Sequence, residues 1–339
     1  MSVSPSSAAV LPATLSTLPD TVMLRDVSLR DGLQDEAPIP TGTKLALFDA
    51  LVAAGVRELE LTSFVRPDRV PALADAEALC AATSDVQATR WGLVLNERGA
   101  RRALGAGLTH LQFVVSVSDT HSRENAGAAA DDAFASLLEV AGPALDAGAT
   151  VEMTLATAFG CPFERRVDPA RVVSFARRAA AAGITSIGLA DTIGVATPNE
   201  VAALVSAVVA VVAATSATSE VGAPDDGADR AGGVHAPARP VTVGAHLHDT
   251  RGLAVANGLA ALQSGATRLD AAVGGLGGCP FAPGASGNVA IEDLAHALGE
   301  MGVDTGLSVD GLVDAARLAC EATGRTVASH VGVAGPRFS

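Results

Sequence analysis

Short segments rich in valine, isoleucine, leucine and threonine alternate along the chain with alanine-rich segments in which apolar residues recur at helical spacing. The first kind predicts strands near residues 22–28, 56–62, 90–96, 109–117, 150–157, 184–190, 241–247 and 267–273. The second kind predicts helices near residues 42–54, 68–82, 97–106, 131–147, 169–182, 198–213 and 252–264, with one or two more after residue 290. Several of these helices end at an Ala-Gly or Ser-Gly pair, and glycine commonly terminates a helix.

Eight strand–helix units in strict alternation predict a parallel sheet, and this number predicts an α/β fold of the (β/α)₈ TIM-barrel type with extra C-terminal helices. An open, doubly wound sheet is the alternative, and it normally carries a glycine-rich phosphate-binding turn after the first strand. Here the first strand runs into Ser28-Leu-Arg-Asp-Gly-Leu-Gln-Asp-Glu36, which is charged and contains one glycine. The barrel is therefore the favoured interpretation.

Two segments lack this apolar periodicity. Residues 1–20 are rich in Ser, Ala and Pro, and we expect a disordered N-terminal tail there. Residues 21–333 are expected to form the catalytic barrel, interrupted at residues 215–240 by a Gly-, Pro- and Asp-rich stretch that we interpret as a flexible insertion. The insertion joins a helix to the next strand and so belongs to the N-terminal face, whereas active sites in this fold lie at the opposite face.

The composition argues against several classes of protein. The chain has 339 residues and a formal net charge of −14, whereas nucleic-acid binding requires a basic face. Its four cysteines are not closely paired, so neither a disulfide framework nor a structural zinc site is expected. No Lys or Arg precedes Arg25, and the most apolar run, residues 201–214, is shorter than the ~20 residues of a bilayer span. We expect a cytoplasmic protein that binds neither nucleic acid nor membrane.

The seventh strand ends in the sequence Gly244-Ala-His-Leu-His-Asp249, which places two histidines at alternate positions. Alternate residues of a strand point to one side, so His246 and His248 are expected to converge at the mouth of the barrel. Asp31, just past the first strand, is expected to reach the same point. Two imidazoles and a carboxylate favour a divalent metal site, although packing histidines and an acidic turn residue are the alternative.

Two further charged residues belong to the same end of the barrel. Arg30 precedes Asp31, and a guanidinium there would stay protonated and could face a developing oxyanion. Glu60 lies on an otherwise apolar strand, where an unpaired carboxylate is unfavourable to bury. It either pairs with Arg30 or acts directly, and pairing is the favoured interpretation.

A glycine-rich segment, residues 274–288, follows the eighth strand and contains Cys279 and Asn288. Its glycines suit a flexible loop that closes over a substrate, and a cysteine there could donate a proton. Cys161, after the fifth strand, could border the pocket, whereas Cys80 and Cys320 fall in helices and are interpreted as packing residues.

The chain contains a single lysine, Lys44, which belongs to the first predicted helix. Barrel aldolases that form a Schiff base need a lysine amine in the pocket, so this chemistry is disfavoured. If the protein makes or breaks carbon–carbon bonds beside a carbonyl, a metal must stabilise the charge.

Five motifs of the chain closely resemble those of the 3-hydroxy-3-methylglutaryl-CoA (HMG-CoA) lyases. They are Val27-Ser-Leu-Arg-Asp-Gly-Leu-Gln34, Glu60-Leu-Thr-Ser-Phe64, Asp191-Thr-Ile-Gly-Val195, His246-Leu-His-Asp-Thr250 and Gly274-Gly-Leu-Gly-Gly-Cys-Pro-Phe281. That family belongs to the metal-dependent barrels that also include isopropylmalate, citramalate and homocitrate synthases. The resemblance runs from residue 22 to 333 without the insertion, and the last motif is the one more specific to the lyases.

The resemblance implies a retro-Claisen cleavage of HMG-CoA, an acyl-CoA substrate, to acetyl-CoA and acetoacetate, in an enzyme that we expect to be a homodimer. It implies that Mg²⁺ or Mn²⁺ is held by Asp31, His246, His248 and Asn288. Arg30 would neutralise the enolate oxygen, Cys279 would protonate the departing carbanion, and Glu60 would orient Arg30 or a metal-bound water. Asp191 is assigned to the base by the same resemblance.

Two residues depart from the family pattern and leave the acyl substituent open. Arg165 stands where the family usually has glycine, and Arg251 stands where the animal enzymes have an aromatic residue. An acetyl-CoA-dependent condensing synthase of the isopropylmalate or citramalate type is the alternative function, and a barrel that only binds an acyl-CoA or a protein partner is a third. Assays of both reaction directions separate the first two.

Overall fold

The computed structural model describes residues 18–221, 240–278 and 287–337, with the backbone alone for residues 216–221. Eight parallel strands form a closed barrel in chain order, in which β8 pairs with β1. The strands are β1 (Met23–Asp26), β2 (Glu58–Ser63), β3 (Thr89–Val94), β4 (His110–Ser116), β5 (Thr150–Ala156), β6 (Ser186–Asp191), β7 (Thr242–Leu247) and β8 (Arg268–Ala271). The predicted TIM barrel is confirmed.

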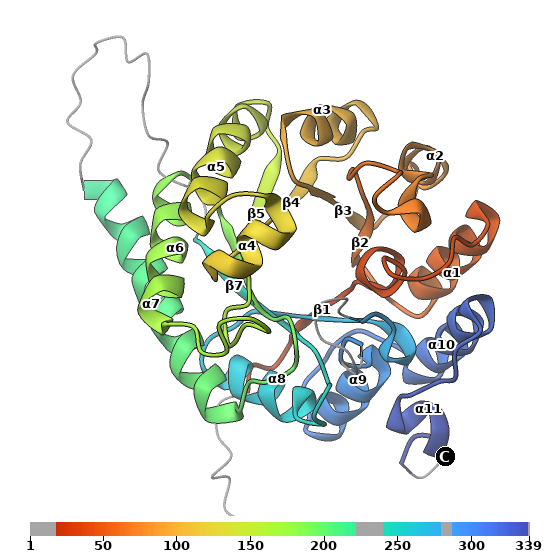
Figure 1. Cartoon of the computed structure of the whole chain (residues 1–339). Coiled ribbons are helices and arrows are strands. Elements are labelled where there is room, and N and C mark those ends of the chain that lie inside the picture. Colours follow the sequence, from red (N-terminus) through yellow and green to blue (C-terminus); the bar gives the residue numbers. More distant parts are fainter. Residues whose placement is uncertain (1–17, 222–239, 279–286, 338–339) are drawn as a thin grey trace, which may run out of the picture.

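Helices surround the strands, and Figure 1 looks down the barrel with most of them in an outer ring. They are α1 (Thr41–Ala53), α2 (Ala76–Ala82), α3 (Glu97–Gly105), α4 (Asp119–Ala126), α5 (Ala130–Asp146), α6 (Pro169–Ala181), α7 (Pro198–Val221), α8 (Ala254–Gln263), α9 (Ile291–Glu300), α10 (Val309–Thr323) and α11 (His330–Ala334). Three short turns are η1 (Ser28–Gly32), η2 (Pro71–Leu73) and η3 (Val273–Gly275). Three helices of the described chain follow residue 290, more than the one or two predicted, and the extra C-terminal helices are α10 and α11. Helix α4 was not predicted from the sequence pattern.

Helix α7 is longer than predicted. The sequence pattern places its end at residue 213 and a flexible insertion at residues 215–240, but the helix continues to Val221. Residues 222–239 lie outside the described part of the chain. By length and composition, Pro198–Thr215 is the one stretch of the described helices that could cross a membrane. Its buried positions, such as Val201, Val205 and Val208, recur at helical spacing, as expected of a helix that packs against a barrel.

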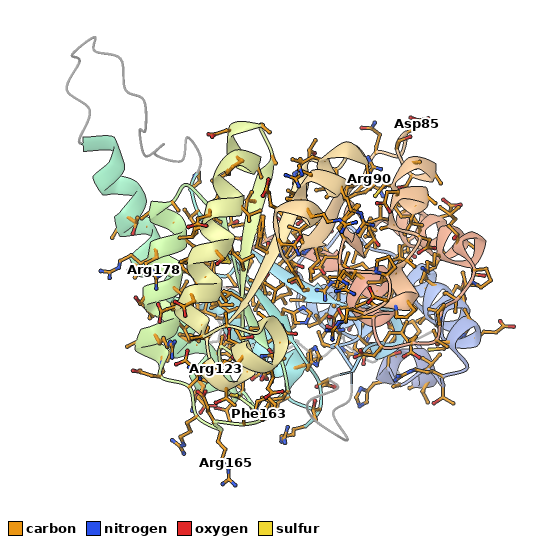
Figure 2. The ribbon with its side chains drawn as sticks, turned by 45° about the horizontal axis from the view of Figure 1, so that its top comes forward. Asp85, Arg90, Arg123, Phe163, Arg165 and Arg178 are labelled. Carbon is orange, nitrogen blue, oxygen red and sulfur yellow. The ribbon has the colours of Figure 1, made fainter. Side chains whose placement is uncertain are left out.

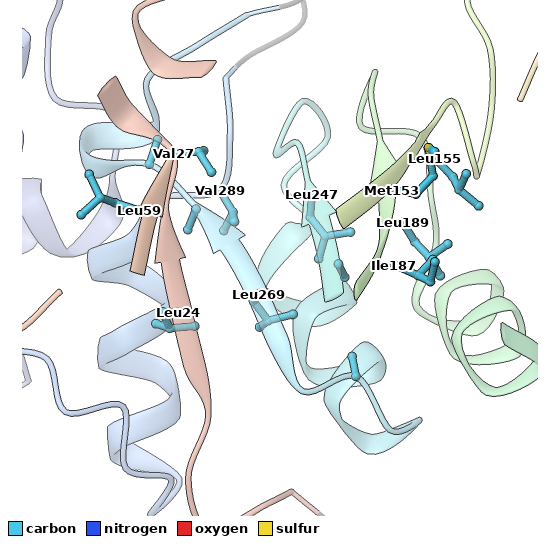
Figure 3. Close-up of a cluster of buried hydrophobic side chains, with 14 of the residues drawn as sticks. Leu24, Val27, Leu59, Met153, Leu155, Ile187, Leu189, Leu247, Leu269 and Val289 are labelled. Carbon is cyan, nitrogen blue, oxygen red and sulfur yellow. The ribbon is translucent and has the colours of Figure 1, made fainter. Parts of the chain in front are cut away.

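The apolar core lies between the strands and the surrounding helices. Leu269 of β8, for example, faces α8, where a Cβ added to Gly258 would lie 3.1 Å from its Cδ1 atom. Figure 3 shows this side chain among equivalent residues of the other strands. They include Leu24, Leu59, Met153, Leu155, Ile187, Leu189 and Leu247, all buried. These positions alternate with others that point into the barrel.

The inside of the barrel is polar rather than apolar, although large branched side chains are usual there. Buried polar residues hydrogen bond to one another across the strands; they are Arg25, Glu60, Gln112, Glu152, Ser186, Arg268 and Asp270. Small residues make room for them: a Cβ added to Gly244 would lie 2.4 Å from Nη2 of Arg268. The interior therefore contains a layer of charged residues directly beneath the rim on which the candidate site lies.

Candidate active site

A tight turn after β1 presents Arg30 and Asp31. Turn η1 is π-helical, with the Gly32 N–H donating to Val27 O at 3.0 Å. Such turns are rare and often occur at functional sites. A Cβ on Gly32 would lie 3.1 Å from Cβ of Leu276, so the glycine allows the loop after β8 to pack against this turn. The adjacent Arg30 and Asp31 thus face the rim from a backbone that has little room to move.

Asp31, His246 and His248 come together at the end of the barrel. The Nε2 atoms of the two histidines lie 3.3 Å apart, and Oδ2 of Asp31 lies 3.8 Å from the first and 3.7 Å from the second. One ligand atom from each residue lies within 4.8 Å of the others. Both imidazoles are buried. A cation between these atoms would contact two imidazole nitrogens and one carboxylate oxygen, which is a donor set suited to divalent metals.

Asn288 completes this group from the segment that returns after the loop. Its backbone N–H donates to Leu276 O at 3.1 Å, and Val289 N–H donates to Leu247 O at 3.0 Å, so the segment is joined to the end of β7. The side-chain Nδ2 lies 2.8 Å from Oδ2 of Asp31, while the buried Oδ1 has no hydrogen-bond partner. Nδ2 also donates to Leu276 O at 3.0 Å, so Oδ1 is the amide atom left without a partner and is the candidate for a further ligand.

In the described part of this loop, two glycines allow close contacts that a larger residue would block. Gly277 has φ of +109°, and a Cβ there would lie 2.7 Å from Nδ2 of Asn288. At Gly287 an added Cβ would lie 2.2 Å from Gly275 O. The two ends of the loop therefore pack closely against the candidate metal site and against each other.

The charges around the group also fit a divalent cation. Ion pairs join three arginines and five carboxylates into one network; its members are Arg25, Arg30, Arg268, Asp31, Glu58, Glu60, Glu152 and Asp270. With all of these groups ionised and the histidines neutral, the network carries two excess negative charges. Uncompensated buried charge is strongly unfavourable. A divalent cation beside Asp31 would neutralise this excess.

The pKa shifts of the candidate ligands Asp31 and His246 also fit a cation between them. Burial opposes the charged form of Asp31, but Arg30 and the two histidines outweigh it and hold the pKa of Asp31 well below its ordinary value. Burial likewise disfavours a charged His246, yet Asp270 and Asp31 raise the pKa of His246. The surroundings therefore favour positive charge at this imidazole, and a cation at Nε2 would supply that charge without a second ring proton.

Arg30 is oriented by three acceptors. Its guanidinium donates to Glu60 through Nε and to Asp31 through Nη1, and Nη2 lies 3.5 Å from Oε1 of Gln112. Glu60 is fully buried, and its other oxygen accepts a hydrogen bond from Gln112 Nε2. This chain of contacts directs the guanidinium toward the carboxylate of Asp31.

Two further carboxylates, Asp26 and Glu292, hold the first residues of the loop after β8. The Ser28 hydroxyl donates to Asp26 at 2.7 Å, and the Ser28 oxygen in turn accepts the Val273 N–H at 2.8 Å. Glu292 accepts the Gly274 N–H at 2.9 Å. Burial raises the pKa of Asp26 and of Glu292 to about 7, although their hydrogen bonds oppose the shift. The base of the loop is thus held by groups that ionise near neutral pH.

Asp191 has different contacts from the ones expected of a base. Its two oxygens accept the N–H groups of Val195 and Ala196, each at 2.9 Å. Burial raises the pKa of its carboxyl, and these two hydrogen bonds oppose the rise. The observed contacts order the loop between β6 and α7, and a catalytic role for Asp191 stays a prediction. Cys279 lies outside the described residues.

Comparison with known proteins assigns the chain to a family. The HMGL-like family matches residues 21–228 and 214–319 of the chain. The chain belongs to the HMGL-like family. It is 36% identical to the mitochondrial hydroxymethylglutaryl-CoA lyase of Mus musculus, covering 96% of this chain and 93% of that protein. It is also 37% identical to an (R)-citramalyl-CoA lyase of Chloroflexus aurantiacus, covering 94% of this chain and 96% of that protein.

Solved structures of HMGL-like proteins have the same fold. The Bacillus subtilis HMG-CoA lyase superimposes with a TM-score of 0.82 at 33% identity, covering 94% of this chain and 99% of that one. An HMG-CoA lyase from Acinetobacter baumannii, in complex with coenzyme A and 3-methylmalate, gives 0.82 at 35% identity, covering 94% and 97%. The family resemblance seen in the sequence motifs is therefore confirmed.

Several site residues of this HMGL-like chain were missed in the sequence. Gln112, Glu152 and Asp270 belong to the network under the rim, and each is a polar residue on a strand whose neighbours are apolar. The same signal singled out Glu60, so it was available for all three. Arg25 precedes the first motif and has no predicted role in the site.

The two departures from the HMGL-like pattern lie in the rim loops. Arg251 donates through Nη1 to Gly194 O at 2.8 Å and to Ile193 O at 3.1 Å, which joins the loop after β7 to the loop after β6. Arg165 closes a turn with Cys161 through two backbone hydrogen bonds of 2.9 Å. Its side chain is exposed and projects away from the molecule in Figure 2.

Replacing Arg165 with Gly is expected to stabilise the protein. Arg165 has φ of +66°, a left-handed conformation in which an L side chain costs about 1–2 kcal/mol. Glycine removes this strain but adds about 0.5–1 kcal/mol of backbone entropy in the unfolded chain. We expect Arg165→Gly to raise the free energy of unfolding by roughly 0.5 kcal/mol in urea denaturation. Arg166→Gly, at an exposed neighbour without positive φ, is the control and should be slightly destabilising; equal losses in both variants would contradict the expectation.

Proposed function

We propose that this protein is a divalent-metal-dependent lyase that breaks a carbon–carbon bond of HMG-CoA to give acetyl-CoA and acetoacetate. The observation that carries the proposal is the convergence of Asp31, His246 and His248, with Arg30 bound to the same aspartate. Membership of the HMGL-like family supports the reaction class, and hydroxymethylglutaryl-CoA lyases are among its relatives. The single lysine supports it too. Lys44 is buried, and its amine donates to Asp75 and to Ala72 O, so it is not placed to form a Schiff base with a substrate.

Each residue of the site has a distinct part in this reaction. Asp31, His246, His248 and Asn288 would hold Mg²⁺ or Mn²⁺, which as a Lewis acid would polarise the tertiary hydroxyl of the substrate. The hydroxyl would give its proton to a base, the role that the family resemblance assigns to Asp191. The bond to the α-carbon of the thioester would then break, which leaves a ketone on one fragment and the electron pair on the thioester enolate. Arg30 would stabilise the enolate oxygen with N–H groups that its contacts to Glu60 hold in place. Cys279 would return a proton to the enolate carbon, which completes acetyl-CoA.

A second substrate is favoured by the similarity to the (R)-citramalyl-CoA lyase. Citramalyl-CoA has one methylene fewer between its hydroxyl-bearing carbon and its free carboxylate, so the same bond cleavage gives acetyl-CoA and pyruvate. One methylene in an enzyme pocket is worth about 1–3 kcal/mol of discrimination. The same site residues would therefore serve either substrate, and the junction that Arg251 makes between the loops after β6 and β7 is where we expect the preference to be set.

A direct assay tests the proposal. Purified protein given HMG-CoA and Mn²⁺ is expected to release acetoacetate, and EDTA is expected to abolish the release until Mn²⁺ is restored in excess. Citramalyl-CoA is assayed in parallel through pyruvate, and the ratio of the two kcat/KM values assigns the substrate. Release of free CoA thiol from acetyl-CoA and a 2-oxo acid would instead show a condensing synthase. Full activity in EDTA would contradict the metal dependence.

A further inference from the structure

The His246 imidazole lies between two carboxylates. Its Nε2 atom faces Asp31 and His248, whereas its Nδ1 atom lies 3.6 Å from Oδ2 of Asp270. His246 and Asp270 are direct partners in the pairing of β7 with β8, so the two backbones fix this approach. His248 differs, because its buried Nδ1 has no hydrogen-bond partner. Of the two histidines, His246 is the one with an acidic group behind its ring.

We infer that Asp270 is a positioning residue that holds His246 in the tautomer and orientation needed to bind the cation of the proposed lyase. This inference rests on the proposed function. An imidazole that binds a cation through Nε2 carries its proton on Nδ1, and a carboxylate behind the ring is the usual acceptor of that proton's hydrogen bond. The distance of 3.6 Å is about half an ångström longer than a hydrogen bond, and it places the carboxylate next to Nδ1 rather than Nε2.

Asp270 is itself fixed by two arginines. Arg25 donates to its oxygens through Nε at 3.1 Å and through Nη2 at 3.0 Å, and Arg268 donates through Nε at 2.8 Å. Glu152 lies between the same arginines, 2.7 Å from each. The carboxylate is 1% exposed. Charge-assisted hydrogen bonds of this kind restrain both oxygens of Asp270, so it can act as a rigid support for the ring.

The packing of the barrel preserves this arrangement. Gly244 lies two residues before His246 on β7, and the Arg268 side chain passes over it. A Cβ added to Gly244 would lie 2.4 Å from Nη2 of Arg268. Ser186 of β6 donates to Glu152 at 2.8 Å and accepts from Arg268 at 3.1 Å. The charged layer inside the barrel thus has a purpose beyond stability: it places one acidic group behind one imidazole.

Mn²⁺ binding tests this role without measuring turnover. Asp270→Asn keeps the shape of the side chain and removes its charge. In metal-stripped protein, with free Mn²⁺ followed by electron paramagnetic resonance, we expect the Kd for Mn²⁺ to rise about 10–100-fold. Asp75→Asn is the control, because it makes the same change at a carboxylate that pairs with Lys44 outside the charged layer. Its Kd is expected to remain within about twofold of the wild type.

A double-mutant cycle separates positioning from a general structural effect. If Asp270 acts through His246, Asp270→Asn should change the Kd little in a His246→Ala background. Asp270→Glu, which retains the charge but displaces it by one methylene, covers the case in which the Asn variant fails to fold, and it too should weaken Mn²⁺ binding. Folded Asn or Glu variants with the wild-type Kd would overturn the inference. A wild-type protein that binds no Mn²⁺ would instead overturn the proposed metal site.

Discussion

Arg30→Gln is expected to lower the turnover of HMG-CoA by about 10²–10³-fold while Mn²⁺ binding is retained. Loss of one donor to a developing oxyanion typically raises the barrier by about 2.7–4 kcal/mol. Arg30 is 6% exposed, so water cannot easily take its place. The variant retains Asp31, His246 and His248, so the candidate ligands remain. The measurement is kcat for acetoacetate release at saturating Mn²⁺, with the Kd for Mn²⁺ determined on the same sample.

The main risk in this experiment is a loss of structure rather than of chemistry. Arg30 pairs with the buried Glu60, and breaking a buried ion pair destabilises a protein by about 3–5 kcal/mol. Glutamine is chosen because its amide still donates a hydrogen bond to Glu60, and circular dichroism checks that the variant is folded. Arg30→Lys is the matched comparison: it keeps the charge but loses the fork of donors, so it should retain more activity than the Gln variant. A folded Arg30→Gln variant with near wild-type kcat would exclude Arg30 from the oxyanion site.

Much of the fold was predictable because the signals are local. Strand β5 is predicted at 150–157 and observed as Thr150–Ala156, since its alternating apolar residues are bounded by Gly148 and by the loop around Cys161. The end of α7 was misplaced because residues 215–221 carry turn-forming Thr and Ser yet continue a helix that has already been nucleated. Helix α4 was missed because its sequence, Asp-Thr-His-Ser-Arg-Glu-Asn-Ala, has no apolar stripe; its Ser118 N-cap was the available signal.

The site was predictable in part for a similar reason. The period of two along a strand suffices to bring His246 and His248 to one point, and the barrel topology then brings the end of β1 beside β8. The layer beneath depends on partners more than a hundred residues apart, such as Arg25 with Glu152 and with Asp270. No local pattern shows that an arginine on β1 will meet a carboxylate on β5. Once the barrel is given, however, every polar residue at an inward position becomes a candidate for that layer.

His246→Ala is expected to raise the Kd for Mn²⁺ by more than about 100-fold. Removal of a hydrogen-bond partner behind a ligand typically costs 10–100-fold in affinity, so removal of the ligand should cost more. The variant also leaves Asp31 and His248 with fewer groups to share a cation. Electron paramagnetic resonance of free Mn²⁺ gives the Kd, and His330→Ala, which removes an exposed imidazole at α11, is the control.

The dependence of activity on added metal then distinguishes a lost ligand from a lost catalytic group. If His246 serves only to hold the cation, mass action should restore much of the turnover of His246→Ala at Mn²⁺ concentrations well above the new Kd. Arg30→Gln should not respond to added Mn²⁺, because its defect is in the stabilisation of the enolate. An unchanged Kd in His246→Ala would remove that histidine from the site, and with it the reason for a carboxylate at Asp270.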